Sequence, residues 1–164
     1  MGYMNGPGSP LLYQDEAAGS VLKLVFVIVP AALLGVSVYL RLSGESSAGL
    51  AMLLETFIIA LIFWLVFPRK YQVYQDHLRI MLGGPFSIKI GFDKIKAIEV
   101  TNRTFATANF VTTITKTYVI IIKKRGLSIA ITPKSKELFV DKAEQALSQW
   151  VKTREVDSPV RITR

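Results

Sequence analysis

Apolar positions are distributed unevenly along this 164-residue chain, and two long apolar runs dominate its first half. Residues 21–42 carry one basic residue near each end, and residues 48–67 carry a single charge, Glu55. A helix of 20 residues is about 30 Å long, the thickness of the hydrocarbon core of a bilayer. The pattern therefore predicts two membrane-spanning helices joined by a short polar turn.

After residue 70 the apolar positions alternate with polar ones, which is typical of half-buried strands. We expect about seven short antiparallel strands, at residues 71–75, 78–82, 87–90, 95–101, 112–115, 118–123 and 127–132. Residues 102–110 are interpreted as a loop or an irregular edge.

A C-terminal helix is expected after Ser135, a candidate N-cap, because apolar residues recur at helical spacing up to Trp150. This stripe consists of Phe139, Ala143, Ala146, Leu147 and Trp150. The predicted fold is thus a membrane α-helical hairpin followed by a curved sheet or barrel, capped by one helix in which Trp150 is buried.

Four segments follow from these patterns. Residues 1–20, rich in Gly, Pro and Ser, are interpreted as an irregular N-terminal arm. Residues 21–67 form the transmembrane hairpin, residues 68–153 a domain outside the bilayer, and residues 154–164 a polar tail.

The balance of charge changes sign at the boundary between the predicted hairpin and the domain. Residues 1–67 hold two basic and four acidic side chains, a balance of −2, whereas residues 68–164 hold 18 basic and eight acidic ones, a balance of +10. Positive charge collects on the cytoplasmic side of membrane proteins. The hypothesis is that both termini and the domain are cytoplasmic.

Five basic residues are candidates for contact with anionic lipid: Arg69, Lys70, Lys123, Lys124 and Arg125. Each Lys or Arg close to an anionic membrane surface contributes about 1 kcal/mol to attraction. The alternative is that these side chains simply face water. Nucleic-acid binding is not expected, because the sequence has no recognisable recognition helix or aromatic platform.

Polar and small residues inside the predicted helices are candidates for contacts within the bilayer. Glu55 is costly there and needs a partner or a bound proton. Arg41 or a polar group of a neighbouring subunit is the expected partner. Ala31 and Gly35, four residues apart, form a small-xxx-small pair that allows close approach of another helix.

The composition argues against a catalytic or metal centre. The chain has no cysteine and one histidine, His77, which excludes thiolate chemistry and multi-histidine metal sites. A catalytic triad at His77 is not expected, because this residue falls in a predicted hairpin turn. We therefore expect no enzyme activity, no cofactor and no metal.

The strand order and local sequence resemble bacterial pleckstrin-homology-like (PH-like) domains over about residues 69–151. The resemblance is carried by YQVYQDHLRIMLGGPFSIKIGFDKIKAIEV, with the Asp76-His77 turn, and by YVIIIKKRGLSIAITPKSKELFVDKAEQAL, with Ile131-Thr132-Pro133 before the helix. Such domains are often tethered to membrane helix pairs, and the family implies a non-enzymatic binding or scaffolding module. The Asp76-His77 turn is shorter than the basic first loop of eukaryotic phosphoinositide binders.

Three functional hypotheses follow. The first is a membrane-anchored interaction module that acts as a subunit, scaffold or assembly factor of a larger membrane complex, or that self-associates. The second is a sensor of anionic lipid or of the membrane surface through the basic domain. The third is a proton-linked transport component that uses Glu55.

Overall fold

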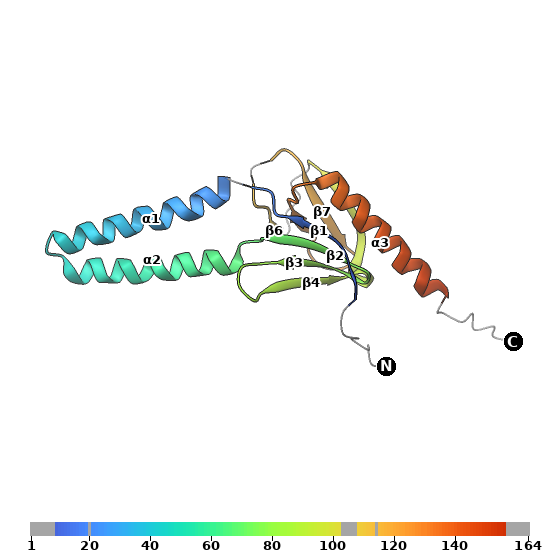
Figure 1. The fold of residues 1–164 in the computed structure, drawn as a ribbon, viewed down its shortest axis with the longest axis horizontal. Helices are drawn as coiled ribbons and strands as arrows, with labels where there is room; N and C mark the ends of the chain where they lie inside the picture. Colours follow the sequence, from blue (N-terminus) through green and yellow to red (C-terminus); the bar gives the residue numbers. More distant parts are fainter. Residues whose placement is uncertain (1–8, 20, 103–107, 114, 157–164) are drawn as a thin grey trace.

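A computed structural model describes residues 9–19, 21–102, 108–113 and 115–156 of the chain (Figure 1). The predictions for residues 1–8 of the arm and 157–164 of the tail lie outside these residues.

Helices α1 (Val21–Leu42) and α2 (Ser46–Val66) form a hairpin that projects away from the rest of the molecule (Figure 1). Both are long and apolar enough to cross a membrane, as the sequence predicted. Only 6% and 11% of the residues in their most apolar windows are buried, so these are not core helices of a soluble domain.

The first sheet has four antiparallel strands in the order β1-β2-β3-β4. They are β1 (Leu11–Glu16), β2 (Lys70–Tyr74), β3 (His77–Met81) and β4 (Ser87–Gly91). The 3₁₀ turn η1 (Phe92–Lys94) leads from β4 into the second sheet.

The second sheet has the order β5-β7-β8-β6. Its strands are β5 (Ile95–Thr101), β6 (Ala108–Phe110), β7 (Tyr118–Lys123) and β8 (Ile129–Ile131). The expectation of purely antiparallel pairing is wrong at one place, because β6 runs parallel to β8. Helix α3 (Lys136–Val156) follows the second sheet.

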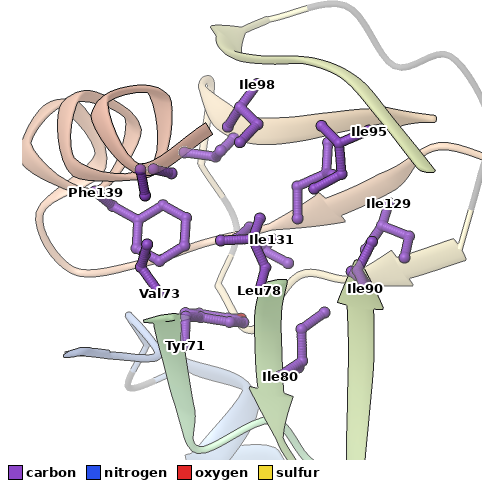
Figure 2. Close-up of a cluster of buried hydrophobic side chains, with 14 of the residues drawn as sticks. Tyr71, Val73, Leu78, Ile80, Ile90, Ile95, Ile98, Ile129, Ile131 and Phe139 are labelled. Atoms are coloured by element: carbon purple, nitrogen blue, oxygen red, sulfur yellow. The ribbon is translucent and has the colours of Figure 1, made fainter. Parts of the chain in front are cut away.

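The core lies between the two sheets and the first half of α3, where side chains from both sheets point toward one another (Figure 2). Phe139, Ala143 and Ala146 of α3 are at most 2% exposed, and Leu147 and Trp150 pack against the same cluster. The apolar stripe of the C-terminal helix therefore covers the core as predicted.

Two details of α3 differ from the prediction. Trp150 is only partly buried, with its ring 6.2 Å from that of buried Phe92 and the guanidinium of Arg154 4.6 Å above it. The helix also continues to Val156, so residues 154–156 are not part of a loose tail.

The N-terminal arm is not irregular over residues 11–16, because these residues form β1 and pair with β2. Tyr13, Asp15 and Ala17 face inward, whereas Leu11 and Leu12 are 47% exposed. The inward Asp15 and the two exposed leucines break the usual alternation of a strand, which explains why β1 was not recognisable in the sequence.

The segment between β5 and β7 also departs from the prediction. Ala108–Phe110 form β6, where a loop or irregular edge was expected, and Thr112 and Thr113 are not in a strand. The Thr112 N–H donates to the Thr132 hydroxyl (2.9 Å), and the Thr112 hydroxyl bonds the Ala18 carbonyl. Hydroxyl groups thus replace the ladder hydrogen bonds that a strand would need. Residues 103–107 and 114 lie outside the described part.

Candidate functional site

The two helices of the hairpin pack most closely near its tip, where Gly49 of α2 meets α1. The Ser37 hydroxyl donates to the Gly49 carbonyl (2.6 Å) and is fully buried. A Cβ at Gly49 would lie 2.9 Å from the Ser37 carbonyl oxygen and 3.1 Å from the Arg41 Cγ. At the opposite end, the Phe26 ring contacts Phe63 (4.7 Å) and Phe67 (5.0 Å).

The sequence did not single out Ser37 and Gly49, although a glycine facing a small polar residue near a predicted turn is a usable signal of close helix packing. The residues it did single out lie elsewhere. Gly35 has no atom within 4 Å of where its Cβ would be, so the Ala31–Gly35 pair is not the contact between α1 and α2.

Ala31 instead borders an apolar groove of about 300 Å³ on one flank of the hairpin. The groove is lined by Pro30, Ala31, Leu34, Leu53, Thr56, Phe57 and Ala60. The Thr56 hydroxyl donates to the Met52 carbonyl of its own helix (2.7 Å) and leaves the groove apolar.

Glu55 lies near the midpoint of α2 with its side chain exposed. Successive residues of a helix are about 100° apart, so Glu55 is about 160° from both Leu53 and Phe57 and faces away from the groove. Within the described residues it makes no hydrogen bond or ion pair, and the expected pairing with Arg41 is not formed. The groove and the carboxyl group of Glu55 therefore lie on opposite sides of α2.

The basic residues considered for lipid contact fall into two groups. Arg69 lies at the junction of α2 and β2, with its guanidinium 5.1 Å from the centre of the Trp64 ring. Lys70 is the first residue of β2 and lies opposite Glu16 of β1. Both are close to the hairpin.

Lys123, Lys124 and Arg125 lie at the other end of the domain. The start of β7 lies near the start of α1. Strand β7 begins beside Ile131 of β8, and the carbonyl of the next residue, Thr132, accepts a hydrogen bond from the Ala18 N–H just before α1 (2.7 Å). From there β7 runs away from the hairpin for about 16 Å, at roughly 3.3 Å per residue. The Lys124 N–H donates to the Lys94 carbonyl in η1 (2.9 Å). In the same 3₁₀ turn, the Phe92 N–H donates to the Asp76 carbonyl (3.1 Å), which lies in the β2–β3 turn, at the end of β2 away from α2.

That far turn borders a small cavity of about 260 Å³. Its lining is Ser9, Gln75, Asp76, Gln149, Trp150 and Thr153. Burial acts to raise the pKa of Asp76, but hydrogen bonds from Ser9 and His77, with the electrostatic effects of His77 and Lys89, outweigh it and lower the pKa. His77 also stacks on Tyr74, with the rings 4.5 Å apart.

His77 therefore has a structural environment, hydrogen-bonded to Asp76 and buried beside Tyr74. Among the residues that the structure describes, no group of three or more His, Cys, Asp or Glu side chains is placed to hold a metal ion.

The folded domain has two sheets and a C-terminal helix behind two apolar helices, an arrangement compatible with a PH-like fold. The family model described as Bacterial PH domain matches residues 69–146. This part of the chain is a bacterial PH domain, a class of domain that is generally a non-catalytic interaction module. No curated protein and no solved structure matches the chain.

Proposed function

We propose that this protein is a non-enzymatic interaction module anchored by two transmembrane helices, acting as a subunit, scaffold or assembly factor of a larger membrane complex. The bacterial PH domain and the two apolar helices support the class of protein. The observation that carries the finer proposal is Glu55, an exposed carboxyl group near the middle of α2 that has no hydrogen-bond or ion-pair partner among the residues that the structure describes.

A charged side chain at the centre of a bilayer costs at least about 2.5–3.5 kcal/mol, and such residues usually face other protein and pair there. Arg41 does not pair with it, so either a bound proton or a group from outside the hairpin offsets this cost. A transmembrane helix of a partner, or of a second copy, that presents a cation or a hydrogen-bond donor has the required chemistry.

Purification in mild detergent tests this proposal. We expect proteins to co-purify in fixed stoichiometry with the wild-type chain and with Glu55→Gln, which keeps hydrogen-bonding capacity, and to be lost from Glu55→Leu. Phe57→Leu, on the opposite flank of α2, is the matched control and should retain them.

A monodisperse monomer from the wild-type chain, with no co-purifying protein, would contradict the proposal. So would a proton flux that is lost in Glu55→Gln while the complex stays intact, since an amide cannot exchange a proton at neutral pH. That result would favour the proton-linked alternative.

A lipid-sensing role receives less support from the geometry. Only Arg69 and Lys70 of the candidate basic residues lie next to the hairpin, and attraction to a membrane surface decays within a Debye length of about 8–10 Å. The Lys123–Arg125 turn is farther away than that along β7. These three cations are better placed to meet a soluble or peripheral protein on the cytoplasmic side.

A further inference from the structure

The turn between β3 and β4 makes an unusually close contact with the end of α2. A Cβ at Gly83 would lie 1.4 Å from the Trp64 carbonyl oxygen and 3.2 Å from the Leu65 Cα, so only glycine fits there. Gly84 has a positive φ of +65°, and its Cβ would lie 3.2 Å from the Trp64 ring. This turn and the last helical turn of α2 therefore lie side by side.

The contact fixes the depth of the turn relative to the helix. A helix of 21 residues is about 30 Å long, so if α2 spans the bilayer its last residues reach the boundary between hydrocarbon and headgroups. Trp64, two residues before the end of α2, is half exposed and stacks with Arg69, as expected of an interfacial tryptophan. The β3–β4 turn lies at the same level.

The exposed side of this turn is apolar. Pro85 is exposed, and the Phe86 side chain is 53% exposed. The Leu82 N–H donates to the Phe86 carbonyl (3.0 Å), which closes the turn and places Phe86 at its base, directly before β4. An aromatic ring in this position gains free energy by entering the interfacial region of a bilayer.

Another apolar turn residue provides a comparison. Leu127 is 65% exposed in the turn between β7 and β8. It follows Lys124 and Arg125 at the end of the domain away from the hairpin, and therefore has no bilayer nearby. Phe86 and Leu127 are both exposed, but only Phe86 lies close to the end of α2 and therefore at the level of the bilayer surface.

We infer that the β3–β4 turn, residues 82–86, is a membrane-docking element that inserts Phe86 into the boundary between headgroups and acyl chains. This inference rests on the proposed membrane-spanning hairpin. It assigns the bilayer itself as the partner of this surface, and the Gly83–Trp64 contact holds the first sheet at a fixed angle to the membrane. The Asp76 turn and the Lys123–Arg125 turn then face the water.

Depth-dependent fluorescence quenching tests the docking element in the full-length chain. Because the chain has no cysteine, single substitutions Phe86→Cys, Leu127→Cys and Ile58→Cys can each be labelled with the same environment-sensitive dye. Each protein is reconstituted into vesicles of phosphatidylcholine and phosphatidylglycerol, in parallel sets without quencher, with lipids that carry a quencher at the top of the acyl chain, and with lipids that carry one near the end of the acyl chain.

We expect quenching at positions 58 and 86 to be severalfold stronger than at position 127, with a blue-shifted emission at both. Quenching at position 86 that equals the value at position 127, while position 58 is quenched, would overturn membrane docking by the turn and leave the hairpin intact. Absence of quenching at position 58 would overturn the hairpin proposal itself. Equal quenching at all three positions would show insertion by the dye and also overturn the docking element.

Discussion

The hydroxyl group of Tyr71 connects three segments that are distant in sequence. It donates to the Phe110 carbonyl at the end of β6 (2.9 Å), and it accepts the Thr132 N–H after β8 (3.5 Å). The side chain is 1% exposed, and this burial raises the pKa of Tyr71 to about 12. Tyr71 is thus a structural residue of the core.

Replacing Tyr71 with Phe should lower the free energy of unfolding at neutral pH by about 1–3 kcal/mol, because buried backbone groups lose their partner. The pKa is higher in the folded state than the usual value of 10.0. The stabilisation that Tyr71 contributes is therefore fully present below pH 10 and is lost as the pH rises toward 12. Denaturant unfolding of the full-length chain in detergent, at pH 7 and above pH 10, measures both effects.

The wild-type protein should lose more stability over this alkaline range than Tyr71→Phe, which has no ionisable group at that position. Parallel loss in the two proteins would contradict the role assigned to the buried hydroxyl.

Gly83 is the residue on which the contact between the domain and α2 depends most strongly. Gly83→Ala should destabilise the full-length chain by roughly 1–3 kcal/mol, the usual cost of overpacking, because the new methyl group would overlap the backbone of Trp64. Gly35→Ala is the control. It adds a methyl group to a helical glycine in open space, so we expect no loss of stability.

Thermal unfolding in detergent checks this pair of variants. An unchanged midpoint for Gly83→Ala would mean that the turn does not lie against α2.

Strand β1 shows why part of the fold could not be derived from the sequence. Its inward face carries Asp15, whose carboxylate accepts the Ser135 N–H just before α3 (2.7 Å) and is 8% exposed. An inward Asp and outward leucines oppose the pattern by which strands are recognised. Residues 108–113 were also not predictable, because the hydroxyl groups of Thr112 and Thr132 replace backbone pairing there.

Elements with a consistent apolar pattern were predictable. The two long helices, β5, β7 and the core-facing stripe of α3 all lie where the alternation or helical spacing placed them. The candidate surfaces were less predictable, because they depend on which turns lie near α2. The sequence showed the charges of residues 123–125 but could not show that β7 runs away from the hairpin.

Helix α3 covers the core with a stripe that ends at the partly buried Trp150. Trp150→Ala should cost about 2 kcal/mol of unfolding free energy, less than the roughly 3–5 kcal/mol of a fully buried aromatic residue. Trp150 packs on Phe92 and supports Arg154. Val151→Ala, at an exposed position of the same helix turn, is the control and should have a smaller effect.

The comparison is made by chemical denaturation of the full-length chain. Equal effects of the two substitutions would contradict the packing of the C-terminal half of α3 on the core.

At the scale of the whole molecule, the hairpin is an insertion into the first sheet. β1 precedes α1, β2 follows α2, and the two strands pair with each other (Figure 1). The Ala17 N–H donates to the Arg69 carbonyl (2.9 Å), directly between the two points where the chain leaves and re-enters the domain. Both helices are therefore held by the domain at one end, and a partner that binds the hairpin is positioned relative to the domain.

In the proposed arrangement, the two helices cross a membrane and the domain lies on its cytoplasmic side. Single cysteines at Ser43, exposed in the turn of the hairpin, and at Ser148, exposed on α3, report the two sides in a chain without other cysteines. In intact cells, a membrane-impermeant thiol reagent should label Ser43→Cys and should label Ser148→Cys only after the membrane is permeabilised. Labelling of Ser148→Cys in intact cells, with Ser43→Cys protected, would contradict the orientation, and equal labelling of both would contradict the membrane-spanning hairpin.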